Sequence, residues 1–105
     1  MTKSYNLSES VWISSSISSN TSLLARNQYF CNTSTALTLS LPTSPNLGDE
    51  IHIFDATGHA GTNNITVNPG STNYINGVNQ NLTIDVNFAG VVVIWTGSTY
   101  GWRVS

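Results

Sequence analysis

Two histidines and two aspartates lie close together in the middle of the chain, and these residue types could bind a metal ion or transfer a proton. They are Asp49, His52, Asp55 and His59. Zinc sites and general bases use the same side chains. Their spacing matches no HExxH, CxxC or EF-hand pattern. We therefore interpret them as solvated residues of a loop and a strand face, and we expect no metal site.

The other patterns that carry chemistry are also missing. The many serines allow a Ser-His-Asp set to be written, but no GxSxG sequence supports it. Asp49 and Glu50 are adjacent, so a strand would point them to opposite faces and they could not share a site. The glycines form neither GxxxxGK nor GxGxxG. The sequence thus predicts no catalytic residue and no cofactor, and we expect that the protein is not an enzyme.

Aromatic side chains remain as candidates for binding. They include Trp12, Tyr74, Trp95, Tyr100 and Trp102. Exposed aromatic rings could form a platform for a sugar, but aromatic residues are also typical of protein interfaces. Trp95 and Trp102 flank the last expected hairpin, which favours packing in the core or between subunits.

The composition excludes several classes of partner. Charged residues make up 8% of the 105 residues, against about 25% in ordinary soluble domains. The permanent cations are Lys3, Arg26 and Arg103, too few to neutralise a run of phosphates or to bind an anionic membrane. No apolar run approaches the roughly 20 residues of a membrane span. We expect no nucleic acid and no membrane as partners. The single cysteine, Cys31, is expected to be a small buried apolar residue rather than a redox group or an intermolecular bridge.

Alternation of apolar and polar residues predicts the elements. Leu37, Leu39 and Leu41 alternate with hydroxyl residues, and Ile51 and Ile53 should face the core in the same way. Asn76 and Gly77 predict a hairpin turn. The apolar run 91–95 fits a strand covered on both faces, by a sheet or by another subunit. Strands recur with turn signals between them, so we expect an all-β fold, a small antiparallel sandwich, barrel or prism-like domain.

We divide the chain into an extended, Ser-rich N-terminal arm, 1–27, and an all-β domain, 28–105. The arm has few apolar residues besides Val11, Trp12 and Ile13. An arm of this kind could become ordered by adding a strand to a neighbouring sheet or by wrapping a partner subunit.

A set of apolar and aromatic residues is our candidate interface with other chains. Its members come from the arm, from the run 91–95 and from the last expected hairpin. They are Val11, Trp12, Ile13, Val92, Ile94, Trp95, Tyr100 and Trp102.

The segment 28–104 resembles a small β domain of virion proteins of tailed bacteriophages, found in fibres, whiskers and head decorations. The resemblance rests on a tyrosine-led strand followed by LTLSLPTSPNLGDEIHIFD, TNNITV, ING, NLTID, AGVVVIW and YGWRV. It implies a trimeric, non-enzymatic building block. Low charge and the apolar run 91–95 independently suit a β unit that completes its core against identical copies.

Within this family we expect a capsid decoration, or cement, protein. A chain of 105 residues that begins at its own methionine is short for a whole fibre, but it suits a homotrimer that binds the major capsid protein and stabilises the head. We therefore expect it in the virion, on the capsid surface. The alternative is a tail fibre or tail-tip component that contacts other tail proteins or a host glycan. A free-standing, monomeric lectin-like module is a third interpretation.

Overall fold

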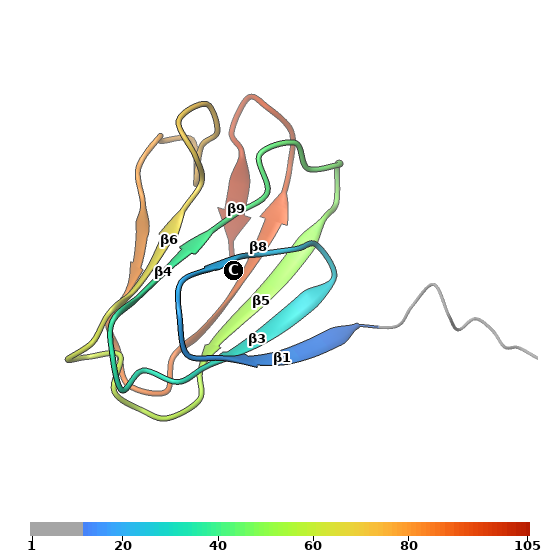
Figure 1. Cartoon of the computed structure of the whole chain (residues 1–105). Coiled ribbons are helices and arrows are strands. Elements are labelled where there is room, and N and C mark those ends of the chain that lie inside the picture. The colour runs from blue at the N-terminus through green and yellow to red at the C-terminus, as the bar shows by residue number, and fades with distance from the viewer. Residues whose placement is uncertain (1–11) are drawn as a thin grey trace, which may run out of the picture.

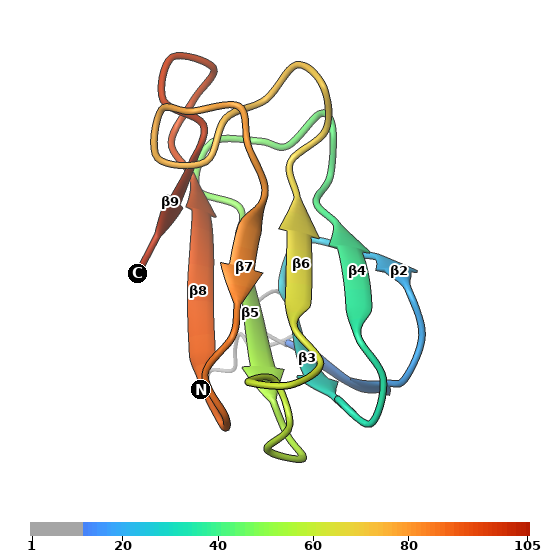
Figure 2. The ribbon, with the colours of Figure 1, turned by 90° about the vertical axis from the view of Figure 1, so that its left-hand side faces the viewer.

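The fold consists of two packed β-sheets. The computed structural model describes residues 12–105, and these contain nine strands and no helix. The strands are β1 (Ile13–Ile17), β2 (Thr21–Ser22), β3 (Asn27–Cys31), β4 (Leu37–Ser40), β5 (Glu50–Asp55), β6 (Ile65–Asn68), β7 (Leu82–Ile84), β8 (Gly90–Trp95) and β9 (Trp102–Val104). The five-stranded sheet has the order β1-β3-β5-β8-β9, and the four-stranded sheet has the order β2-β4-β6-β7 (Figures 1 and 2). The expectation of an all-β fold is confirmed.

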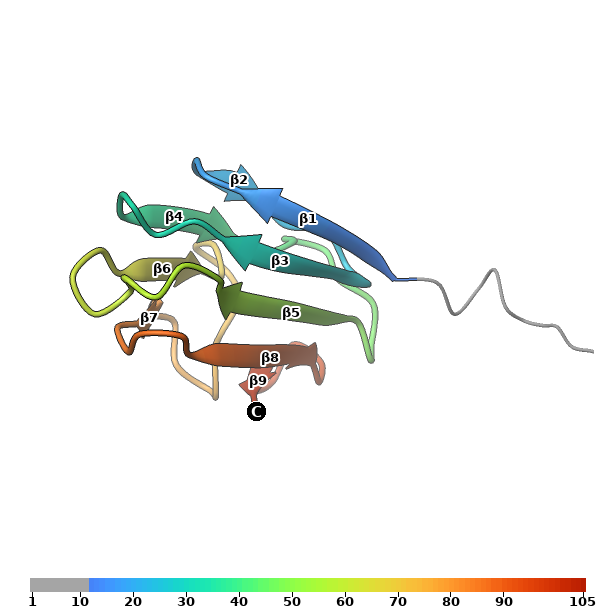
Figure 3. The ribbon, with the colours of Figure 1, turned by 90° about the horizontal axis from the view of Figure 1, so that it is seen from below.

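The chain moves from one sheet to the other after each of its first strands. Figure 3 shows the result as stacked rows, in which β1 lies beside β2, β3 beside β4, and β5 beside β6. Successive rows run in the same direction, so β1, β3 and β5 are parallel, as are β2, β4 and β6. The chain then reverses, and β7, β8 and β9 add antiparallel strands to the two sheets.

The predicted antiparallel strand direction is therefore wrong for four of the seven strand pairings among the described residues, which are parallel. Both sheets are mixed. Two strands that follow each other in one sheet are separated along the chain by a strand of the other sheet, and such a crossover connection brings them together in parallel.

The Ser-rich segment is also more closely joined to the domain than the predicted boundary at residue 27 implies. Residues 13–17 form β1, which pairs with β3 along its full length, and residues 21–22 form β2, which pairs with β4. These strands extend the two sheets of their own chain by backbone hydrogen bonds, which need no apolar side chains. The rest of the predicted arm, 1–11, lies outside the described residues.

The core lies between the two sheets and follows the predicted alternation. Leu37, Leu39 and Leu41 are buried, whereas the intervening Thr38 and Ser40 are exposed. Ile51 and Ile53 of β5 are also buried, as predicted. The remaining apolar core side chains are Leu23, Tyr29, Cys31, Ala60, Ile65, Val67, Ile75, Ile84, Val93, Trp95 and Trp102.

Two turn positions depend on backbone conformations that most residues avoid. Asn76 and Gly77 have φ values of 50° and 81°, and the flanking Ile75 and Val78 exchange two backbone hydrogen bonds. Two successive positive φ values are those of a hairpin turn of the type that Asn-Gly predicts, so this prediction is confirmed. At Gly101, where φ is 77°, a Cβ atom would overlap the backbone of Tyr74.

We expect Gly101→Ala to destabilise the fold much more than Gly97→Ala. Both glycines have positive φ, but no atom lies within 4 Å of the position of a Cβ at Gly97. Gly97→Ala should therefore cost only the conformational strain, about 1 to 2 kcal/mol, whereas Gly101→Ala adds a clash with backbone that cannot move away easily. Urea unfolding of the two variants measures the difference. Equal free energies of unfolding would contradict the close approach at Gly101.

Candidate functional site

The outer face of the five-stranded sheet carries a continuous group of aromatic and aliphatic side chains. We call it the aromatic face, and it consists of Trp12, Phe30, His52, Phe54, Val92 and Ile94. All six are half-buried, because they shield one another while the four-stranded sheet covers only the opposite, inner face (Figure 3). They occupy the strand positions that alternate with the core residues.

The register of the strands brings these side chains together. Phe30 lies opposite Phe54, and their rings are stacked with centroids 5.7 Å apart. The ring of His52 meets Phe54 edge-on at 6.2 Å and the ring of Trp12 at 4.5 Å. Val92 lies opposite His52 on the other side. The rings therefore form one connected surface drawn from segments far apart in the sequence.

One ion pair lies on the same face. Nε2 of His52 is 2.5 Å from Oε2 of Glu50, two residues earlier on β5. Residues two apart on a strand point to the same side, so this contact follows directly from the strand geometry. Within residues 12–105 it is the only contact within 4 Å between an acidic and a basic side chain. The aromatic face consequently has very little charge.

The buried carboxylate of Asp55 lies at the other surface of β5 and is used for structure. Its Oδ1 accepts hydrogen bonds from the hydroxyl of Thr33 at 2.7 Å and from the amides of Thr57 and Gly58 at 3.3 and 2.9 Å. Its Oδ2 accepts from the amides of Ala60 at 3.0 Å and Phe88 at 2.9 Å. These donors belong to the loops after β3, β5 and β7, so one side chain fastens three connections.

These contacts decide the protonation of the Asp55 carboxyl. Burial by itself would raise its pKa, but the hydrogen bonds from Thr33, Phe88, Ala60 and Gly58 outweigh burial and hold the pKa well below the ordinary value. The carboxylate is thus ionised and surrounded by donors. A general base needs a lone pair that a substrate can reach, and this side chain is only 3% exposed.

Cys31 is buried next to Asp55 in the core. Burial, followed by the negative charge of Asp55, raises the pKa of its thiol to about 11. A thiol with this pKa is protonated at neutral pH and is a weak nucleophile. Its full burial fits the predicted role as a small apolar residue.

The four residues first considered for chemistry have different surroundings. Asp49 accepts a hydrogen bond from the Asn46 amide at 2.8 Å and closes the turn before β5. His52 belongs to the aromatic face, Asp55 is buried, and His59 is exposed in the loop after β5. The interpretation of Asp55 as a solvated residue was therefore wrong. Among residues 12–105, no three His, Cys, Asp or Glu side chains are placed to hold a metal ion together.

The predicted interface residues divide into three groups. Trp12, Val92 and Ile94 lie on the aromatic face, and Ile13 and Tyr100 are exposed, by 58% and 70%. Trp95 and Trp102 instead pack edge to face inside the core with their centroids 5.4 Å apart, so neither forms a surface for a second chain. Val11 lies outside the described residues. Alternation along β8 explains the division, because Val93 and Trp95 face inward and Val92 and Ile94 outward. Within residues 12–105 only the inner face of the run 91–95 is covered, whereas the sequence predicted cover on both faces by a sheet or by another subunit.

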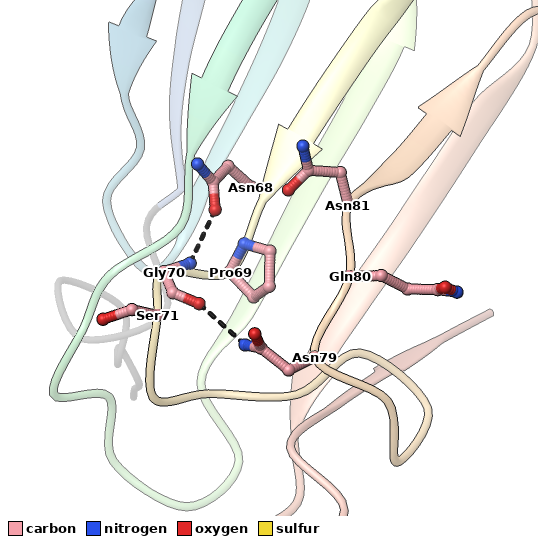
Figure 4. A pocket seen from close by; sticks show the side chains of 7 residues that line it. All are labelled: Asn68, Pro69, Gly70, Ser71, Asn79, Gln80 and Asn81. Atoms are coloured by element: carbon pink, nitrogen blue, oxygen red, sulfur yellow. Dashed lines mark hydrogen bonds between the residues drawn. The ribbon is translucent and has the colours of Figure 1, made fainter.

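A cleft of about 260 Å³ lies between the end of β6 and the segment that leads into β7 (Figure 4). Its walls are Asn68, Pro69, Gly70, Ser71, Asn79, Gln80 and Asn81. The side chain of Asn68 accepts a hydrogen bond from the Gly70 amide, and that of Asn79 donates to the carbonyls of Gly70 and Asn73. These amides fasten the loop itself, and Gln80 points away from the cleft (Figure 4). We assign it no ligand.

The chain matches no known protein family, and no curated protein is similar to it.

We expect Asp55→Asn to destabilise the fold by roughly 3 kcal/mol, because it removes the charge that five donors share and turns an amide group toward some of them. The exposed Asp85→Asn is the matched control and should change stability little. Urea unfolding at neutral pH measures both variants. Equal stability of the two would contradict a central role for Asp55.

The same carboxylate should make the stability depend on pH in a defined direction. Its pKa is lower in the folded than in the unfolded chain, where it is about 3.9. Its contribution is therefore complete above that pH and is lost as the pH falls below it. The free energy of unfolding should decrease between pH 5 and pH 2 in the natural protein, and the decrease should be smaller in Asp55→Asn. Parallel curves for the two proteins would show that other groups cause the acid dependence.

Proposed function

We propose that this protein is a non-enzymatic structural protein of a tailed-phage virion, a homotrimeric decoration protein that binds and stabilises the assembled capsid from outside. The aromatic face is the observation that carries the proposal. A monomer would leave this group of rings and aliphatic side chains half-exposed to water, whereas docking would bury them.

The composition of the aromatic face suits protein contact. Aromatic residues are enriched and charged residues depleted in the centres of protein interfaces. Burial of apolar surface contributes about 25 cal/mol for each Å² removed from water. Glu50 and His52 contact each other on this face, so the polar atoms of both side chains have a partner within the chain. The surface is therefore suited to an identical copy or to an apolar region of a capsid subunit.

The open sheet edges offer a second means of association. β1 and β9 form the edges of the five-stranded sheet, and β1 presents serines next to the aromatic face. An edge strand has unpaired backbone donors and acceptors that can add a strand from another chain. Neighbouring copies in a trimer could use this edge together with the face.

The surroundings of Asp55 and Cys31 support a role without catalysis. Asp55 is occupied by structural hydrogen bonds, and Cys31 is buried and protonated. The sequence resemblance to virion β domains points to the same class of function. The alternative within that class is a tail fibre or tail-tip component.

We expect the purified protein to be a trimer whose stability depends on the aromatic face. Val92→Ser should raise the concentration at which the trimer dissociates by at least about tenfold, because it places a polar group at the centre of a buried surface. Phe30→Ser should act in the same direction. Val78→Ser is the matched control, since Val78 is 51% exposed on the hairpin turn and lies off this face. Light scattering over a dilution series measures the oligomeric state.

A monomer at every concentration would contradict the homotrimer. Electron cryo-microscopy of phage particles that lack the protein then tests the location. We expect intact tails with capsids that release DNA at a lower temperature. Unchanged capsid stability with missing tail appendages would reject the decoration role in favour of the tail fibre alternative.

A further inference from the structure

A second cleft, of about 280 Å³, lies where the parallel strands of the five-stranded sheet begin. Its walls are Trp12, Arg26, Leu47, Gly48, Asp49 and Glu50. Trp12 and Arg26 immediately precede β1 and β3, and Glu50 is the first residue of β5. The register of the three strands places them in one row across the sheet. Backbone hydrogen bonds from Ile13 to the Arg26 carbonyl and from Arg26 to the Glu50 carbonyl fix this row.

The cleft concentrates charge in a chain that has little. Arg26, Asp49 and Glu50 are three of the eight Lys, Arg, Asp and Glu residues of the whole sequence. Arg26 forms no ion pair with Asp49 or Glu50 although all three line the same space. One oxygen of Asp49 accepts the Asn46 amide, and its other oxygen accepts no hydrogen bond from residues 12–105. The cleft thus offers both donors and acceptors to a ligand.

The backbone at Arg26 is in the left-handed region, which residues other than glycine and asparagine rarely adopt. Its φ is 63°, at a turn position where glycine or asparagine is the usual choice. The two other residues of this kind, Asn76 and Phe88, are explained by the hairpin turn and by the hydrogen bond to Asp55. At Arg26 the backbone hydrogen bonds to the Glu50 carbonyl and from the Ile13 amide hold this conformation, and the side chain lines the cleft. Residues held in strained conformations are concentrated at binding sites.

We propose that this cleft binds one ring of an uncharged saccharide. A guanidinium only donates and a carboxylate only accepts hydrogen bonds, whereas each sugar hydroxyl does both, so neighbouring hydroxyls can satisfy Arg26 and Asp49 together. The indole of Trp12 supplies an apolar wall beside these groups, as saccharide C–H groups require. The volume is just below the range of about 300 to 1,000 Å³ that holds drug-sized ligands, which limits the site to about one ring.

This site differs from the aromatic platform that the sequence suggested, because Trp95 and Trp102 are buried in the core. The proposal also does not depend on capsid binding, since it can be measured on the isolated protein. Trp12 belongs to both the cleft and the aromatic face, so the test variants leave it unchanged. Failure of saccharide binding would leave the trimer measurement unaffected, and the reverse also holds.

The test is saturation-transfer NMR of the purified full chain with methyl glycosides of glucose, galactose and mannose, followed by titration of those that bind. We expect at least one to bind with a Kd on the order of 1 mM. Arg26→Asn and Asp49→Asn should each weaken binding about tenfold, the effect expected from loss of one charge-assisted hydrogen bond. Asn tolerates positive φ at position 26 and keeps an acceptor for the Asn46 amide at position 49, so both variants should fold.

Arg103→Asn is the matched control, since Arg103 is exposed on β9 and does not line the cleft. Its affinity should equal that of the natural protein. The proposal would be overturned if none of the glycosides binds, or if binding is the same in Arg26→Asn and Asp49→Asn. It would also be overturned if only charged ligands such as glucuronate or glycine bind, because the cleft would then recognise charge rather than hydroxyl groups.

Discussion

The buried carboxylate of Asp55 is the interaction on which one whole end of the sandwich depends. β5 ends at this residue, and three loops that each join one sheet to the other donate hydrogen bonds to its two oxygens. A carboxylate offers about four lone-pair sites and no donor, so it matches converging N–H groups that a neutral side chain could satisfy only in part. Three loops are thereby fastened by one buried side chain.

The opposite end of the sandwich is determined by strand direction. Because β1, β3 and β5 are parallel, their beginnings lie side by side. Trp12 and Arg26, which precede β1 and β3, therefore form a row with Glu50, the first residue of β5. An antiparallel sheet of the same strands would have placed Arg26 at the other end from Glu50. The parallel order thus separates the two ends, with the loops fastened by Asp55 at one and the charged cleft at the other.

The parts of this fold that were predicted from the sequence are those with local causes. Side-chain alternation along β4 and β5 identified the core residues, and Asn76-Gly77 identified a turn, because each depends only on neighbouring residues. Pairing direction was not predictable in the same way, since nothing within β3 specifies which strand lies next to it. The serines of β1 were assigned to an arm because backbone pairing, which composition does not reveal, holds them in the sheet.

Asp55 and the aromatic face show the same distinction between local and long-range causes. An aspartate at a strand end before Ala-Thr-Gly is a local turn signal that could have identified Asp55, but its partners Thr33 and Phe88 are 22 and 33 residues away. In β8, apolar residues continue at Val92 and Ile94, where alternation predicts polar ones. Such a run requires cover on both sides, and the described chain covers only one. The aromatic face is therefore a consequence of the sequence pattern, because the continuous apolar run that places Val93 in the core also places Val92 and Ile94 on the outer face.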